Sequence, residues 1–184
     1  FFTTKEVGKG TGLGLSTVFG CTLEGAVSED EVVRMAVASV EAGCDEVGLA
    51  DTTGYANPEQ VRRVSKKVRA AIGDKLSGAH LHNTRGLGLA NVVAALDAGV
   101  TTFDSSLGGL GGCPFAPGAT GNIVTEDLVF MLEAMGLRTG IDIDKLLAIR
   151  KIVAEGIPGE PLYGYVPDAG VTKGFVPAST LVKQ

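Results

Sequence analysis

The sequence predicts an α/β fold built on a parallel sheet, and three observations lead to this prediction. Between residues 21 and 105, amphipathic helical patterns alternate with short apolar runs. Each helical pattern ends at a glycine, and an apolar run follows at once. Each apolar run then ends in polar residues. Helices that alternate with buried strands in this way are typical of αβ units on a parallel sheet.

The first unit begins at a capping box. Ser28 is the expected N-cap, and Glu31 stands three residues later, which is the spacing at which the two side chains satisfy free backbone N–H groups. An apolar stripe follows, and Gly43 is expected to end the helix. Residues 47–50 then form a short buried strand that ends at Asp51.

The second unit begins at Asn57-Pro58, because proline is favoured at the first position of a helix. Gly73 closes this helix, and residues 76–81 form the next strand, which leads into a pair of histidines. A third helix ends at Gly99, and a strand over residues 100–103 follows.

The later part of the chain is expected to contain two more helices, one from Thr125 and one over residues 144–155. From residue 157 onward, four prolines argue against regular helix, so this tail is expected to be irregular.

The chain contains only two histidines, His80 and His82. Residues two apart on a strand point to the same face, so two imidazoles would lie side by side at the end of this strand. Such a pair can provide two facial ligands to a metal ion. The alternative is two ordinary polar residues on an exposed strand.

Four candidate site residues fall where predicted strands end: Asp51, His80, His82 and Asp104. In parallel α/β folds the carboxyl ends of the strands build the functional site. Their convergence at one edge therefore predicts a site there. For each carboxylate the alternative is a turn or N-cap residue.

A glycine-rich loop over residues 105–115 follows the last predicted strand. Such a loop is typical of a mobile lid over an active site. Cys113 lies near its tip and is a candidate acid, base or nucleophile. The alternative is a small apolar residue in a turn.

Composition excludes several classes of protein. The net charge is −5 and no basic patch is present, which argues against nucleic-acid binding. No apolar run reaches membrane-spanning length, and no signal peptide is visible. Three cysteines without CxxC spacing argue against disulfides and zinc knuckles. The sequence thus predicts a protein of the reducing cytoplasm.

Several stretches together resemble the C-terminal half of the hydroxymethylglutaryl-CoA lyase family. They are Phe19-Gly20-Cys21, residues 48–54, residues 80–86, and above all residues 108–127. That family consists of TIM-barrel metallolyases with a pyruvate-carboxyltransferase-like domain. The resemblance therefore implies a partial TIM (β/α)8 barrel made of about the last four βα units, with parallel strands.

The resemblance also implies roles for particular residues. The metal ligands would be His80, His82 and Asn122, on a divalent Mg²⁺ or Mn²⁺ ion. Cys113 would act in proton transfer, and Asp51, His80 and Glu126 would complete the catalytic residues.

The family reaction is a retro-Claisen cleavage of 3-hydroxy-3-methylglutaryl-CoA to acetoacetate and acetyl-CoA, a step of leucine degradation. The resemblance thus implies an acyl-CoA substrate for this chain. Full members begin with a strand that carries an Arg-Asp pair, which these 184 residues do not contain. We therefore expect the chain alone to be catalytically incomplete. Half a barrel also exposes two sheet edges, which predicts a homo-oligomer.

The first residues carry a second resemblance. Phe1 to Lys5 and Gly10 to Ser16 resemble the ATP lid and second glycine box of a sensor histidine kinase. The expected division is a kinase-like segment at 1–18 that would replace a barrel strand, a half-barrel lyase domain at 19–157, and an irregular Pro/Gly-rich tail at 158–184. Two alternatives to a lyase stay open: a non-catalytic chimeric fragment that self-associates, and an ATP-binding kinase fragment.

Overall fold

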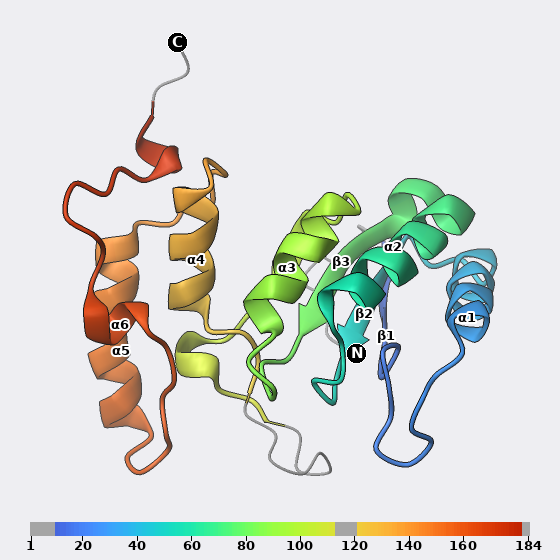
Figure 1. Ribbon diagram of the computed structural model, residues 1–184, viewed down its shortest axis with the longest axis horizontal. Coiled ribbons are helices and arrows are strands. Elements are labelled where there is room, and N and C mark those ends of the chain that lie inside the picture. Colours follow the sequence, from blue (N-terminus) through green and yellow to red (C-terminus); the bar gives the residue numbers. More distant parts are fainter. Residues whose placement is uncertain (1–9, 113–120, 182–184) are drawn as a thin grey trace. The chain divides into compact units, whose positions relative to one another are not determined.

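A computed structural model describes residues 10–112 and 121–181 (Figure 1). The chain divides into two compact units. Among the described residues, the first comprises 10–104 and 112, and the second comprises 105–111 and 121–181.

The first unit is built on a parallel four-stranded sheet in the order β1-β2-β3-β4. Its strands are β1 (Gly12–Leu15), β2 (Glu46–Asp51), β3 (Leu76–Leu81) and β4 (Thr102–Asp104). Strands that follow each other in space as they do in sequence are typical of a barrel, whereas a doubly wound sheet reverses its order. The predicted partial barrel of four parallel strands is confirmed.

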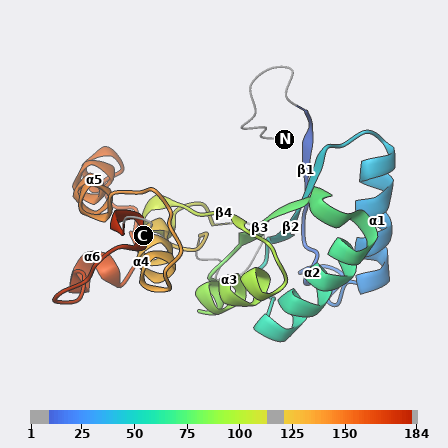
Figure 2. The same cartoon turned by 90° about the horizontal axis from the view of Figure 1, so that it is seen from above.

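Three helices cover one face of this sheet: α1 (Glu29–Glu41), α2 (Pro58–Ile72) and α3 (Gly88–Asp97) (Figure 2). Neighbouring helices also pack against each other, α1 on α2 and α2 on α3. Each crossover thus returns over the same face, as the alternation of helix and strand predicts.

The predicted helix starts are confirmed by their caps. The Ser28 hydroxyl accepts a hydrogen bond from the backbone N–H of Glu31, and the Asn57 side chain accepts one from the N–H of Gln60. Each cap satisfies a donor that the first helical turn leaves free. Gly73 ends α2 with a φ of 61°, a conformation that other residues adopt at a steric cost.

The two faces of the sheet differ in residue size. On the face beneath the helices, Val47, Leu49 and Leu81 are almost fully buried. Gly48 and Gly78 alternate with these residues and pair directly with each other in the strand register. At these two glycines the opposite face of the sheet therefore exposes only backbone. The hydrophobic core lies between the sheet and the helices.

The last strand starts two residues later than predicted. The sequence places it over residues 100–103, whereas β4 spans Thr102–Asp104. The N–H of Val100 bonds to the carbonyl of Ala95 and so still belongs to the turn that ends α3. This turn delays the start of strand pairing.

The second unit contains α4 (Thr125–Ala134), α5 (Ile143–Gly156) and the short α6 (Val166–Ala169). Val129, Ile143 and Leu146 form its buried apolar cluster. The expectation that prolines exclude regular helix from the tail is wrong for α6. Pro167 lies in its first turn, where a missing N–H leaves no helical hydrogen bond unmade. No helix in the described part of the chain combines the length and apolarity needed to cross a membrane.

Candidate metal and catalytic site

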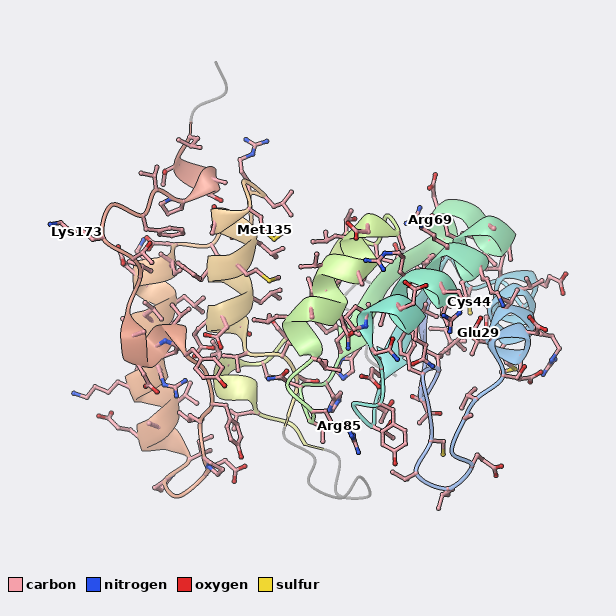
Figure 3. All side chains as sticks on the ribbon, viewed as in Figure 1. Glu29, Cys44, Arg69, Arg85, Met135 and Lys173 are labelled. Atoms are coloured by element: carbon pink, nitrogen blue, oxygen red, sulfur yellow. The ribbon has the colours of Figure 1, made fainter. Side chains whose placement is uncertain are left out.

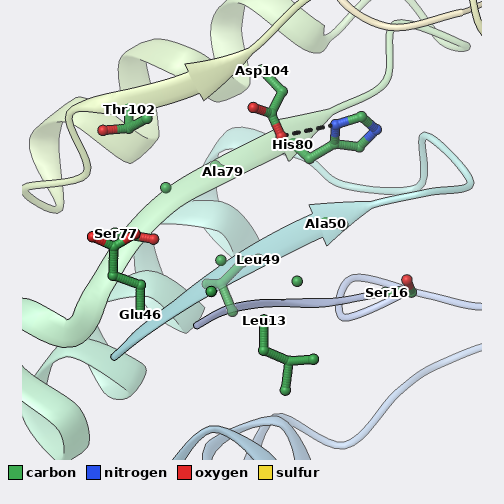
Figure 4. A pocket seen from close by; sticks show the side chains of 14 residues that line it. Leu13, Ser16, Glu46, Leu49, Ala50, Ser77, Ala79, His80, Thr102 and Asp104 are labelled. Atoms are coloured by element: carbon green, nitrogen blue, oxygen red, sulfur yellow. Dashed lines mark hydrogen bonds and ion pairs between the residues drawn. The ribbon is translucent and has the colours of Figure 1, made fainter. Parts of the chain in front are cut away.

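The open face of the first unit's sheet bounds a hollow of about 650 Å³ (Figure 4). Gly14, Gly48 and Gly78 are register partners across three strands, so no side chain fills this part of the hollow. His80 and Asp104 line the hollow toward the carboxyl ends of their strands. The hollow and these two polar side chains therefore lie together at the carboxyl edge of the sheet, where the sequence predicts a site.

The two histidines are brought together as the i, i+2 spacing predicts. Their Nε2 atoms lie 3.2 Å apart, and the ring planes are inclined by 63°. With metal–nitrogen bonds of about 2.1 Å, two adjacent ligands lie about 3.0 Å apart at 90° and about 3.4 Å apart at a tetrahedral angle. The separation of the two Nε2 atoms therefore fits two ligands of one ion.

Asp104 contacts the other ring nitrogen of His80. Its Oδ2 lies 3.3 Å from His80 Nδ1, so the Nδ1–H of the neutral ring can donate to the carboxylate. The hydrogen bond from His80 holds the pKa of Asp104 below its usual value, against the opposing effect of partial burial. The carboxylate is thus kept ionised beside the imidazole.

Asp51 lies at the end of β2 and is almost completely buried. Burial raises the pKa of its carboxyl group, and hydrogen bonds from the loop oppose this rise. Its Oδ1 accepts from the backbone N–H of Tyr55 at 2.9 Å, and both oxygens are 3.2 Å from the N–H of Ala56. The Asp51 side chain therefore fixes the loop that leads into α2, which is the turn role left open by the sequence.

Asn122 belongs to the second unit and is partly buried. Its Nδ2 donates to Ser106 Oγ at 2.6 Å and to the carbonyl of Leu110 at 3.2 Å. Its Oδ1 is buried and has no hydrogen-bond partner among the described residues. An amide oxygen oriented in this way, with its donors already occupied, suits a hard cation.

Glu126 is fully buried near the start of α4. Its two oxygens accept from the N–H of Gly108 at 3.2 and 3.1 Å, and Arg150 Nη1 lies 3.5 Å away. Arg150 also donates to the carbonyls of Leu162 and Tyr163. Glu126 therefore fixes the turn at Gly108, where φ is 59°, within the loop predicted to be a lid.

Cys113 lies outside the described residues, as do Phe1 to Lys5 of the kinase-like start. The described part of that start, from Gly10, leads directly into β1, and a turn over residues 16–19 follows. Val18 continues the contact, since its N–H bonds to the carbonyl of Ala50. The segment thus supplies a strand that pairs in parallel with β2.

Arg85 lies within residues 80–86, and its sequence pattern indicates no role for it. Its guanidinium carbon lies 4.5 Å from the centre of the Tyr55 ring. Its Nη1 donates to the carbonyls of Thr53 and Gly54, so Arg85 also holds the loop after β2. Figure 3 shows Arg85 and Arg69 at opposite ends of the first unit. Arg150 was missed as well, and in both cases no local pattern indicates the contact.

The described residues include no group of three or more His, Cys, Asp and Glu side chains arranged to hold a metal. The paired Nε2 atoms lie in the first unit, and the buried Asn122 Oδ1 lies in the second.

Comparison with known proteins agrees with these features. The model of the HMGL-like family matches residues 4–153, a range that includes most of the kinase-like start. A hydroxymethylglutaryl-CoA lyase of Bacillus subtilis is 48% identical over 148 residues, which are 80% of this chain and 49% of that protein. An (R)-citramalyl-CoA lyase of Chloroflexus aurantiacus is 43% identical over 86% of this chain and 50% of its own length.

Among solved structures, a lyase of Acinetobacter baumannii in complex with coenzyme A and 3-methylmalate superimposes with a TM-score of 0.83 at 44% identity. The match covers 90% of this chain and 54% of that one. The chain thus spans about half the length of the relatives it matches.

Proposed function

The chain belongs to the HMGL-like family, and on that premise we propose that it acts in carbon–carbon bond cleavage of a 3-hydroxyacyl-CoA. The proposed reaction converts 3-hydroxy-3-methylglutaryl-CoA to acetoacetate and acetyl-CoA. The observation that carries the proposal is the pair of Nε2 atoms 3.2 Å apart at the carboxyl end of β3. The relatives that are similar in sequence to this chain include lyases named for hydroxymethylglutaryl-CoA and for citramalyl-CoA.

We propose His80 and His82 as ligands of a divalent ion, Mg²⁺ or Mn²⁺, with Asn122 as a further ligand. When bound, such an ion would polarise the substrate hydroxyl and carboxylate oxygens. The buried Oδ1 of Asn122, which has no hydrogen-bond partner among the described residues, supports this assignment. The 3.2 Å separation of the two Nε2 atoms supports it as well.

In the proposed reaction a general base takes the proton of the substrate's C3 hydroxyl, the C2–C3 bond breaks, and C3 becomes the ketone carbon of acetoacetate. The electron pair of the broken bond forms the enolate of acetyl-CoA, which must then take up a proton. We propose Cys113 as the donor of this proton on the basis of the resemblance. Glu126 would act by fixing the turn at Gly108, five residues before Cys113, and Asp51 by fixing the loop after β2.

The metal assignment is tested by adding Mn²⁺ to the 184-residue chain and following the histidine ring signals by NMR. Paramagnetic broadening of both His80 and His82 signals is expected. His82→Ala should weaken the broadening at His80, because one of two ligands has been removed. Unchanged ring signals at millimolar Mn²⁺ would contradict the assignment.

The reaction is tested with two polypeptides. The 184 residues alone should cleave 3-hydroxy-3-methylglutaryl-CoA at the background rate, since they lack the Arg-Asp strand and a lost electrostatic group commonly costs on the order of 10²–10³ in rate. The same residues joined behind the N-terminal half of the Bacillus subtilis lyase should show metal-dependent cleavage that Cys113→Ala abolishes. A folded, metal-binding chimera without activity would refute the lyase proposal.

We also propose that the chain self-associates. Within the described residues, β1 and β4 each pair with one neighbouring strand, so both have an edge that can accept another strand. A twofold dimer would bring β4 of one copy beside β1 of the other and close eight strands. Sedimentation at micromolar concentration tests this, and a sharp monomer boundary would refute it.

The free thiols of Cys21 and Cys44 support the proposal of a reducing cytoplasm.

A further inference from the structure

His80 and Asp104 lie side by side because of the strand register. The two residues are direct partners in the parallel pairing of β3 with β4. Both line the hollow on the open face, and Asp104 Oδ2 is 3.3 Å from His80 Nδ1 (Figure 4). The contact is therefore set by backbone pairing as well as by side-chain conformation.

We propose that Asp104 is a positioning residue that selects the tautomer of His80. By accepting the Nδ1–H, its carboxylate holds the proton on that nitrogen and leaves the lone pair on Nε2, the atom that faces His82. Histidines that bind metals commonly donate their other ring N–H to a carboxylate, which fixes the ring and raises its basicity. The inference rests on the proposed divalent-metal site.

Among the residues that the structure describes, the other carboxylates near the hollow do not contact His80 Nδ1. The carboxylate of Asp51 is occupied by the backbone N–H groups of Tyr55 and Ala56. On β2 the register partner of His80 is Ala50, which has no polar side chain. Glu46 also lines the hollow, but it lies at the first residue of β2, toward the opposite end of the strands. Asp104 is thus the carboxylate that can accept a hydrogen bond from Nδ1 of His80.

A merely structural role for Asp104 makes different predictions. Its side chain is 73% exposed, so the contact adds little to stability. A surface ion pair of this kind would leave the proton position on His80 and its affinity for a metal unchanged when the carboxylate is removed. These two properties therefore separate the alternatives.

The test uses Asp104→Ala in the 184-residue chain at pH 8, where free imidazole is neutral. Long-range ¹H–¹⁵N NMR of the metal-free protein reports which nitrogen of His80 carries the proton. The wild type should show the proton on Nδ1, and the variant should shift it toward Nε2. Mn²⁺ affinity should then fall roughly 10–100-fold. Asp104→Asn keeps an acceptor oxygen and should restore part of both effects.

Asp74→Ala is the matched control, because Asp74 is an exposed carboxylate that precedes β3 at the other end and contacts Arg69. It should leave both the His80 tautomer and the Mn²⁺ affinity unchanged. An unchanged His80 tautomer in a folded Asp104→Ala protein would overturn the inference. Absence of Mn²⁺ binding by the wild type, with the expected tautomer shift in the variant, would instead refute the proposed metal function.

Discussion

Replacing Glu133 by Gln should remove a pH-dependent part of the stability of the second unit. Glu133 lies in α4, is 2% exposed, and accepts four hydrogen bonds. The donors are the backbone N–H and the hydroxyl groups of Thr139 and Ser179. Burial is the largest single influence and raises the pKa of Glu133, but the four hydrogen bonds together lower this pKa from 4.5 to about 2.

The magnitude follows from linkage between proton binding and folding. A carboxyl group with a folded pKa of about 2 and an unfolded value of 4.5 differs by about 2.5 units, which corresponds to at most about 3 kcal/mol. Because the folded pKa is lowered, this stability is fully present above pH 4.5. It is lost as the pH falls from 4.5 toward 2.

The assay is urea unfolding of wild type and Glu133→Gln, followed through the backbone amide NMR signals of α4 between pH 7 and pH 2.5. We expect the wild type to be more stable by about 2–3 kcal/mol at pH 7, and this difference to shrink below pH 4.5. Glu155→Gln, on an exposed residue paired with Lys151, should change stability by no more than about 0.5 kcal/mol. A difference between wild type and Glu133→Gln that stays constant down to pH 2.5 would refute this reasoning.

Three further substitutions test the contacts of the site. Asp51→Ala should lower the free energy of unfolding by about 1–3 kcal/mol in urea titrations, because the N–H groups of Tyr55 and Ala56 lose their acceptor; an unchanged midpoint would argue against this role. Gly54→Ala should lower the melting temperature more than Gly86→Ala does. Both glycines have a positive φ, but only at Gly54 would the new Cβ lie 2.6 Å from the Thr84 side chain. Equal decreases in melting temperature would contradict this expectation. Arg150→Met should cost about 3 kcal/mol or more, since Glu126 would stay buried with one ion-pair partner removed; native-like stability measured by urea would count against that ion pair.

Local patterns predicted the parts of this chain that depend on local physics. The caps at Ser28 and Asn57, the parallel strands and the shared face of His80 and His82 all follow from spacing and periodicity. The partners of Asp51 lie within five residues, yet the sequence could not distinguish this structural role from a catalytic one. The contact of Asp104 with His80 depends on the register between two strands, which no pattern within either strand specifies.

The contacts of Glu126 with Gly108 and Arg150 lie even further from local reasoning, because they join residues 18 and 24 positions apart. The helical periodicity of α4 predicts which apolar residues are buried, but it does not predict that acidic residues of the same helix are buried as well. Burial of a carboxylate can be predicted only once the positions of the loops that supply its hydrogen-bond donors are known.

The carboxylates of α4 also set how far the chain can be shortened. Asp127 accepts the backbone N–H groups of Tyr165 and Val166, and Glu133 accepts those of Thr139 and Ser179. A chain cut after residue 157 would therefore remove the donors of Asp127 and half of those of Glu133. Each such group costs about 1–3 kcal/mol or more when unsatisfied. The tail looks dispensable by its composition, but its backbone completes the interior of the second unit as far as Ser179.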